Sequence, residues 1–343
     1  MADTNPNKAE LTLRRHRLTP AARAAVREVF VSAEQFIQPH FVVEGLAERE
    51  PVKGMPGVHR ETVATLLQQL AADLEKGVNR IILFGVPAAK AERDFNFNFT
   101  AAVIERIKQQ FGEQLWVAVD VCVCSHTVHG QCGVVNDAGD HVDNAATVDE
   151  LARAALVYAE AGADCVAPSD MMDGRVGAIR SILDEHGFAE VTLMSYSAKF
   201  HSGFYGPFRG AADSAPKPGS EISLKDRATY QIDPTHPADA LQSSERDLKE
   251  GADILMVKPG MPYLDVLARL TVALPQVPWA VYEVSGEYAA IEVLAAEQLI
   301  DRERAHVEVW VAFVRAGATH IISYGARHAA EWLAVWDKRE QQE

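Results

Sequence analysis

The sequence predicts a (β/α)8 TIM barrel with an extended N-terminal arm, and three observations support this fold. Eight short apolar segments alternate with helical patterns, four of the segments follow a glycine, and polar residues gather where the segments end. Repeated strand and helix alternation indicates a parallel sheet. Eight such units in roughly 300 residues fit a closed barrel better than an open doubly wound sheet.

The expected elements come in a regular order. Strands are predicted at residues 40–44, 80–85, 115–121, 165–168, 191–196, 254–258, 279–284 and 320–323. Helical patterns between them include residues 61–76, 148–161, 175–186, 263–273, 289–298 and 302–316. Thr147 and Glu150 have the spacing of a capping box and place the start of the second of these helices.

Glycine marks the joints between helix and strand. Gly77, Gly162, Gly251 and Gly317 each stand shortly before a predicted strand. A glycine after the last helical residue commonly takes the left-handed conformation that ends a helix. No Gly-x-Gly-x-x-Gly or P-loop pattern follows any strand, which excludes the usual nucleotide-binding folds.

Composition limits the possible functions. The formal charge of −15 argues against a nucleic-acid partner and against binding to anionic membranes. Four cysteines in 343 residues do not suggest a disulfide framework and favour a reducing compartment. No secretory signal or membrane-spanning apolar run is visible, so we expect a soluble cytoplasmic protein.

Residues 1–36 differ from the barrel expected at 37–343, because they combine basic side chains with scattered leucine, valine and phenylalanine. They are either a solvated terminus or an arm that packs on a neighbouring subunit. The apolar residues favour the arm.

Lys258 ends the apolar run Ile254-Leu-Met-Val, and Pro-Gly follows it directly. Such a run is typical of a buried strand, where lysine is rarely tolerated without a reason. Burial lowers the pKa of an ammonium group, and a neutral amine attacks ketones to form a Schiff base. The alternative is a lysine that extends its head group into water.

A second lysine, Lys199, lies just beyond the strand expected at 191–196. The carboxyl ends of barrel strands meet at one rim, where active sites lie, so both lysines are expected over the same mouth. Two ammonium groups there would repel, which favours a neutral amine. Two amines indicate either two carbonyl substrates, or one amine that reacts and one that assists.

Cys122, Cys124 and Cys132 form a C-x-C pair followed by a third cysteine in one loop. Three thiolates suit zinc and leave its fourth position open, as in a catalytic site. His126 or His129 is an alternative fourth ligand that would close the site, and three ordinary buried cysteines are a further alternative. Cys165 lies within a strand and is expected to be a small buried side chain.

Cationic and hydroxyl side chains complete the rim. Arg209 and Arg227 carry guanidinium groups that match carboxylates, and residues 211–220 and 225–231 are interpreted as a lid over an acidic substrate. Ser285 and Tyr324 follow the last two strands and are candidates for a second carboxylate.

Five segments together resemble one family. Residues 120–133, 167–176, 196–209, 256–265 and 284–288 occur in the order found in porphobilinogen synthase, also called 5-aminolevulinate dehydratase, of the zinc-cysteine type. The resemblance runs from about residue 35 to the end of the chain. It implies a lyase of tetrapyrrole and heme biosynthesis that condenses two 5-aminolevulinate molecules to porphobilinogen and two waters.

The resemblance also implies roles for particular residues. Lys258 would form a Schiff base with the first substrate and Lys199 would bind the second, beside a zinc ion on the three cysteines. The implied substrate contacts are Asp120, Ser169, Tyr205, Arg209, Arg227, Gln231, Ser285 and Tyr324. Asp120 and Ser169 would meet the first amino group, Ser285 and Tyr324 the first carboxylate, and the arginines with Gln231 the second carboxylate. Family members form homo-octamers through N-terminal arms, which fits residues 1–36.

Several parts of the chain depart from the family pattern, among them a shortened segment at residues 94–99 and an unusual version of the lid at residues 215–224. Glu283 replaces the usual glutamine or histidine, and Gly325 replaces an aromatic residue. Ser243 stands where magnesium-activated relatives have glutamate, so we do not expect an allosteric magnesium ion. The alternative functions are a Schiff-base aldolase, which needs one lysine and no metal, and an inactive barrel that senses zinc or redox state.

Overall fold

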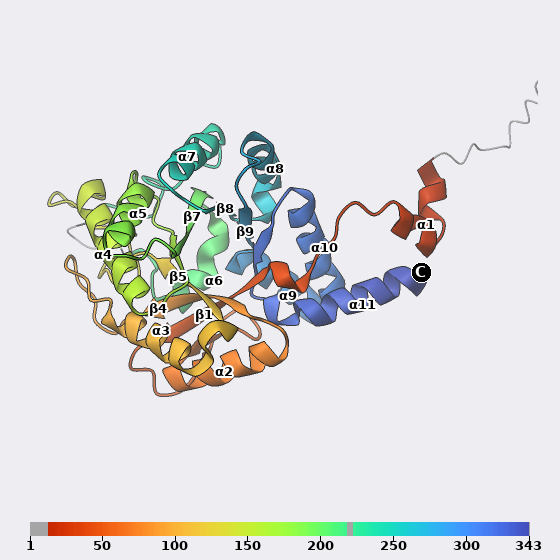
Figure 1. Ribbon diagram of the computed structural model, residues 1–343, viewed down its shortest axis with the longest axis horizontal. Coiled ribbons are helices and arrows are strands. Elements are labelled where there is room, and N and C mark those ends of the chain that lie inside the picture. Colours follow the sequence, from red (N-terminus) through yellow and green to blue (C-terminus); the bar gives the residue numbers. More distant parts are fainter. Residues whose placement is uncertain (1–12, 218–221, 343) are drawn as a thin grey trace, which may run out of the picture.

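Eight parallel strands close into a barrel that is covered by helices (Figure 1). The computed structural model describes residues 13–217 and 222–342. In barrel order the strands are β1 (Phe36–Val43), β4 (Arg80–Val86), β5 (Trp116–Val121), β6 (Cys165–Pro168), β7 (Thr192–Lys199), β8 (Ile254–Lys258), β9 (Trp279–Tyr282) and β10 (His320–Ile322). Because β10 pairs with β1, the barrel is closed and the predicted fold is confirmed.

The helices follow the predicted rhythm with several additions. Those at predicted positions are α2 (Val63–Glu75), α4 (Asn144–Glu160), α5 (Arg175–Glu185), α8 (Leu264–Ala273), α9 (Ser285–Ala296) and α10 (Arg302–Arg315). The others are α1 (Pro20–Ala25), α3 (Asn98–Phe111), α6 (Gly206–Ala211), α7 (Ala238–Lys249) and α11 (Ala329–Gln342). A short hairpin of β2 (Glu50–Pro51) and β3 (His59–Glu61) was not predicted, because strands of two or three residues show no usable alternation.

Short 3-10 helices connect these elements. They are η1 (Leu13–Arg17), η2 (Ala33–Gln35), η3 (Gly112–Gln114), η4 (Gly203–Tyr205), η5 (Met261–Tyr263) and η6 (Ala326–His328). The four glycines predicted at helix ends have φ angles between 85° and 105°, as the left-handed conformation requires.

The predicted capping box at Thr147 and Glu150 is wrong. Helix α4 begins earlier, and Asp143 caps it by accepting a hydrogen bond from the Ala146 amide. The Thr147 hydroxyl instead accepts from the Val134 amide, 2.9 Å away, and so holds the loop that follows the cysteines. The spacing was misleading because threonine also serves as a side-chain link inside a helix.

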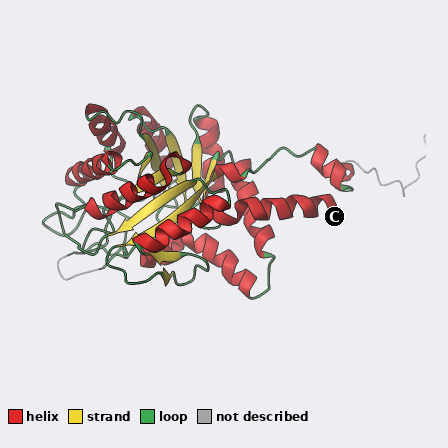
Figure 2. Cartoon of the chain, turned by 60° about the horizontal axis from the view of Figure 1, so that its bottom comes forward, coloured by secondary structure: helices red, strands yellow, loops and turns green. Residues whose placement is uncertain are grey.

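The N-terminal segment lies beside the C-terminal helix rather than on the barrel wall. Figure 1 and Figure 2 show α1 beyond the barrel, next to the end of α11. Arg27 donates to Asp337 over 3.0 Å and joins the two. Residues 1–12 of the predicted arm, residues 218–220 of the predicted lid and residue 221 lie outside the described residues. Within the described part of the chain, no helix has both the length and the apolarity needed to cross a membrane.

Candidate active site

Lys199 and Lys258 end two neighbouring parallel strands and lie in register with each other. Strand β7 is longer than predicted, because a register shift between Ser195 and Ala198 carries it on to Lys199. Both side chains are about 5% exposed or less. They line one cavity, together with Asp120, Cys124, Ser169, Tyr205, Phe208 and Arg227. The two predicted lysines therefore share one buried site.

Aromatic rings surround the amine of Lys258. Its Nζ lies 4.0 Å from the ring centre of Tyr282 and 4.9 Å from those of Tyr196 and Phe208. Ring faces favour the ammonium form, but burial disfavours it and the nearby charge of Lys199 adds repulsion. Burial is the larger effect and, with Lys199, lowers the pKa of Lys258 to about 7. A substantial share of neutral amine is therefore present at neutral pH.

Glu287 holds the loop that follows Lys258. Its carboxylate accepts hydrogen bonds from the amides of Met261, at 2.5 Å, and Val284, at 2.6 Å, with a longer contact from Gly260. It thereby joins the end of β8 to the start of α9. Burial raises the pKa of Glu287 to about 8, against the lowering effect of these amide donors. This role of Glu287 was not predicted from the sequence, although a glutamate at the third position of a helix is a signal for it.

Lys199 donates a hydrogen bond to the carbonyl oxygen of Ser169 at the end of β6. Asp120 lies at the end of β5, and among the described residues its Oδ1 has no hydrogen-bond partner. Burial raises the pKa of Asp120 to about 6, while Lys199 and Lys258 oppose that rise. A buried acceptor beside two amines is suited to a cationic or amine-bearing ligand.

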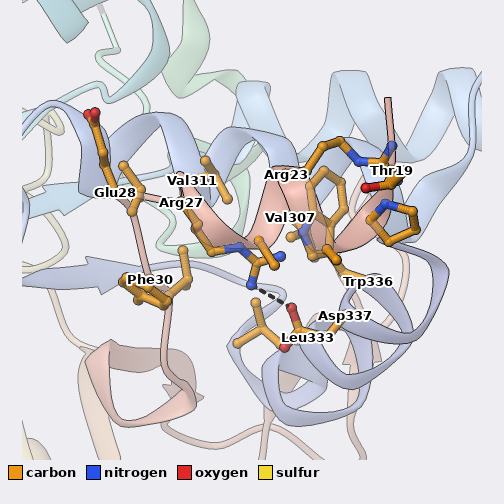
Figure 3. Close-up of a pocket in the computed structure, with 15 residues that line it drawn as sticks. Thr19, Arg23, Arg27, Glu28, Phe30, Val307, Val311, Leu333, Trp336 and Asp337 are labelled. Carbon is orange, nitrogen blue, oxygen red and sulfur yellow. Dashed lines mark hydrogen bonds and ion pairs between the residues drawn. The ribbon is translucent and has the colours of Figure 1, made fainter. Parts of the chain in front are cut away.

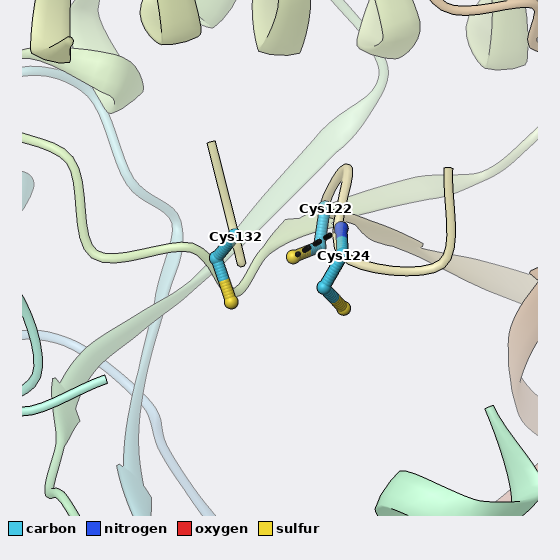
Figure 4. A group of neighbouring side chains, drawn as sticks. All are labelled: Cys122, Cys124 and Cys132. Carbon is cyan, nitrogen blue, oxygen red and sulfur yellow. Dashed lines mark hydrogen bonds between the residues drawn. The ribbon is translucent and has the colours of Figure 1, made fainter. Parts of the chain in front are cut away.

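Cys122, Cys124 and Cys132 form a compact group of ligand atoms. Their three sulfur atoms all lie within 4.8 Å of one another, and all three residues are buried (Figure 4). In the described part of the chain, neither His126 nor His129 contributes an atom to this group. The Nδ1 of His129 accepts from the Gln131 amide instead. Converging thiols of this kind fit a metal ion with one open position.

Tyr230 and Arg227 support the cysteine group. The Tyr230 hydroxyl accepts from the Cys132 amide over 3.1 Å and donates to the Gln131 side chain over 2.7 Å. Hydrogen bonds from the Cys122 and Cys124 thiols lower the pKa of Cys132, and the charge of Arg227 lowers it further. Tyr230 was another residue that the sequence analysis did not single out, although it lies in the predicted lid.

Arg227 also joins the lid to the cysteine loop, donating to the carbonyl oxygens of Gly130, at 2.9 Å, and Ser214, at 2.7 Å. Nearby polar atoms remain buried and unpaired within the described residues, namely the Nε atoms of Arg209 and Arg227 and both amide atoms of Gln231. Burial and the charge of Arg227 lower the pKa of Arg209. Unpaired buried donors near two guanidinium groups are suited to an anion such as a carboxylate.

Four predicted substrate residues do not line the lysine cavity: Arg209, Gln231, Ser285 and Tyr324. The Ser285 hydroxyl accepts from the Phe208 amide, 3.0 Å away, and the Tyr324 hydroxyl accepts from Tyr282 over 3.2 Å. The cavity itself has a volume of about 10 Å³, close to the space that one water molecule needs. The side chains that line this cavity must therefore move before a larger molecule can reach the lysines.

Comparison with known proteins gives a consistent result. The sequence profile of the family described as delta-aminolevulinic acid dehydratase matches residues 10–332. The delta-aminolevulinic acid dehydratase of Synechococcus elongatus is 40% identical over 326 residues, which cover 94% of this chain and 98% of the relative. That of Streptomyces coelicolor is 43% identical over 328 residues, covering 93% and 96%.

A solved structure shows the same similarity. It is the crystal structure of delta-aminolevulinic acid dehydratase (porphobilinogen synthase) from Toxoplasma gondii, in complex with the reaction product porphobilinogen. The TM-score is 0.88 at 37% sequence identity, and the match covers 95% of this chain and 92% of the other. The similarity therefore extends over nearly the whole chain.

Proposed function

Because this chain belongs to the delta-aminolevulinic acid dehydratase family, we propose that its two buried lysines bind the two molecules of 5-aminolevulinate that it condenses. The protein is a lyase that forms porphobilinogen and releases two waters. The observation that carries the proposal is the register of Lys199 with Lys258, at the mouth of one barrel and over one cavity.

The two lysine amines form the covalent bonds to the substrates. The neutral Lys258 amine adds to the ketone of the first substrate, and loss of one water leaves an iminium in which the lysine nitrogen is bonded to that carbon. Lys199 binds the ketone of the second substrate in the same way. Forming one C–C and one C–N bond between the substrates, with loss of protons from the atoms that become the pyrrole ring, then releases both lysine amines. The two waters of the overall reaction are those lost when the two iminium groups formed.

The remaining side chains orient the substrates. Asp120 and Ser169 receive the amino group of the first substrate, and Ser285 and Tyr324 its carboxylate once the segment that contains Phe208 has moved away. Arg209, Arg227 and Gln231 receive the second carboxylate, which would accept hydrogen bonds from their unpaired N–H donors. A Schiff-base aldolase needs only one lysine and no metal, so that alternative function would not explain Lys199 or the three cysteines.

The donor set fits a zinc ion. Three buried thiols within 4.8 Å of one another, with Cys124 also lining the lysine cavity, supply soft ligands and one open side. When bound, zinc supplies a Lewis acid beside the second substrate. Cys122, Cys124 and Cys132 would hold it, and Tyr230 would fix the position of Cys132 through its hydrogen bond to that residue's amide.

The activity is tested directly by mixing the purified protein with 5-aminolevulinate and measuring pyrrole formation. We expect turnover that depends on zinc. If no pyrrole forms with zinc present, while the protein is folded, the proposed function is wrong.

Arg227→Gln is expected to raise the KM for 5-aminolevulinate by roughly tenfold to a hundredfold, because a charge-assisted contact to carboxylate is lost. Steady-state kinetics measure this change. Lys217→Gln is the matched control, since Lys217 lies in the predicted lid but its side chain is 57% exposed. An unchanged KM in Arg227→Gln would exclude a carboxylate role for this arginine.

We further propose that the N-terminal arm joins subunits into an octamer. Leu13 and Phe30 are more than 65% exposed, which is unusual for large apolar side chains. Between the arm and helices α10 and α11 runs a groove of about 910 Å³, lined partly by Val307, Val311 and Trp336 (Figure 3). A second copy of the chain would cover these surfaces.

We also place the protein in the cytoplasm, because its four free cysteines suit a reducing compartment.

Deleting residues 1–30 is expected to reduce the size of the assembly, because the deletion removes the exposed apolar side chains of the arm. Size-exclusion chromatography with light scattering measures the mass, with the full-length chain as control. Circular dichroism checks that the barrel remains folded. An unchanged mass for the folded, truncated protein would contradict the role of the arm.

A further inference from the structure

Glu283 is a fully buried carboxylate that follows β9 and lies outside the substrate cavity. Its Oε2 accepts hydrogen bonds from the Ser323 hydroxyl, at 2.6 Å, and the Trp310 indole, at 3.0 Å. Its Oε1 lies 3.2 Å from Nδ1 of His306. A buried carboxylate is costly unless donors and a positive charge surround it, and here three donors from α10 and the end of β10 do so.

His306 connects Glu283 to a second carboxylate, that of Glu292. Its Nε2 lies 3.0 Å from Oε1 of Glu292, which also accepts from Nε of Arg302 over 2.7 Å. The histidine therefore lies between two carboxylates, and Arg302 balances the second of them. The rings of Tyr288 and Trp332 cover its faces, with ring centres 5.3 and 5.0 Å away. This arrangement favours an imidazolium that donates from both nitrogens.

Glu283 is connected to residues that flank Tyr324 in the sequence. The Ser323 hydroxyl that donates to Glu283 also accepts from the Gly325 amide over 3.0 Å. The Glu283 amide donates to the Ile322 carbonyl over 2.9 Å, so the ends of β9 and β10 are linked by backbone and side chain. Tyr324 lies between these linked positions, and Ser285 is two residues from Glu283.

Gly325 belongs to the same cluster. A β-carbon at this position would lie 3.1 Å from Trp310 and 3.2 Å from Trp332, which is closer than a side chain normally packs. A side chain at position 325 would therefore require the rings of Trp310 and Trp332 to shift by a few tenths of an ångström. Glu283 and Gly325 are thus parts of one arrangement.

We propose that Glu283, held by His306 and bonded to Ser323, is a positioning residue that sets the place of Tyr324 and Ser285 at the site for the first substrate's carboxylate. This inference rests on the proposed function, in which those two hydroxyls bind that carboxylate. Glu283 does not touch the substrate. It acts through the ends of β9 and β10, as a support that fixes groups which do.

The ion pair gives this support a pH dependence. The charge of Glu283, with the hydrogen bonds that His306 donates to both glutamates, outweighs burial and raises the pKa of His306 to about 9. The ordinary value is 6.5, so the pair contributes fully below about pH 6.5 and is lost as pH rises through about 9. The groups that face His306 are Glu283, Glu292 and Tyr288, with the rings of Trp310 and Trp332 and the neighbouring charge of Arg302.

The test is Glu283→Gln, which keeps the shape but removes the charge that holds His306. We expect the KM for 5-aminolevulinate to rise about fivefold to tenfold with kcat within about twofold, because substrate binding is weakened rather than the lysine chemistry. The wild-type KM should rise further above about pH 9, and the variant should lack that extra rise. Ser323→Ala removes the side-chain contact beside Tyr324 but keeps the ion pair and the backbone bond between Glu283 and Ile322, so it should raise KM without removing the pH effect.

Asp164→Asn is the matched control, because it removes a carboxylate bonded to Lys108 at the opposite, amino-terminal end of β6. If Glu283→Gln and Ser323→Ala lower thermal stability but keep wild-type KM and pH profile, as the control should, the inference is overturned. The variant Tyr324→Phe tests the premise, that Tyr324 binds the substrate carboxylate, separately from the inference about Glu283. A raised KM in Tyr324→Phe but not in the Glu283 and Ser323 variants defeats the inference alone. An unchanged KM in Tyr324→Phe, with pyrrole still formed, overturns both the carboxylate role and the inference, but not the reaction.

Discussion

Borohydride added together with 5-aminolevulinate is expected to leave a stable adduct on the peptide that contains Lys258 and to inactivate the enzyme permanently. Borohydride reduces an imine to a secondary amine, so only a lysine that has formed a Schiff base is labelled. Lys258→Ala is expected to lower kcat by about 10⁴-fold or more, because both the covalent step and the orientation it provides are lost. Peptide mass spectrometry and pyrrole formation measure the two effects.

The same reaction should depend on pH in a definite direction. Because burial and Lys199 lower the pKa of Lys258 to about 7, protonation removes the nucleophile as pH falls below about 7. Labelling at a fixed short time should therefore decrease from pH 8 to pH 6. Lys76→Ala, at an exposed position after α2, is the control and should label as the wild type does. Adducts found only on other lysines would refute the role of Lys258.

A chelator is expected to abolish pyrrole formation, and added zinc is expected to restore it. The three cysteine sulfurs lie close enough to share one ion, and Cys124 also borders the lysine cavity. Losing a Lewis acid at that position should reduce kcat by about 10³-fold or more, since several kcal/mol of charge stabilisation disappear. Metal analysis should find one zinc per subunit in the wild type.

Cys124→Ser tests the same site through binding as well as activity. We expect its zinc content to fall together with its turnover, because a hydroxyl is a poor replacement for a thiolate ligand. Cys165→Ala is the control, as Cys165 is buried within the barrel and apart from the three ligands. Full turnover by protein that contains no bound metal would dismiss the metal site.

Much of the barrel was predictable because its signals are local. Each apolar run is long enough to show a buried strand, and each of the four glycines ends a helix by its own backbone conformation. The gathering of polar residues at one rim of the barrel was predictable from the topology, since residues after parallel strands meet at one edge. Helices α3 and α11 were not predicted, and neither was the small hairpin of β2 and β3.

The prediction of the site was less complete where it depended on packing. Phe208 and Tyr230 have no chemistry of their own that marks them in a sequence, yet one borders the lysine cavity and the other holds Cys132. Ser285 was predicted as a substrate contact, and its hydroxyl accepts a hydrogen bond from the amide of Phe208, which lines the cavity. Such contacts join residues far apart in the chain and leave no periodic signal.

The sequence by itself determined the order of strands and helices, the presence of two lysines at strand ends, and a loop with three cysteines. These features depend on residue type and short spacing, which a linear chain displays directly. Only the tertiary structure decided that Lys199 and Lys258 lie in register, that the cysteine sulfurs converge, and that Glu283 meets His306. The reason is that strand register and side-chain packing are set by contacts between distant segments, whose free energies depend on the whole fold.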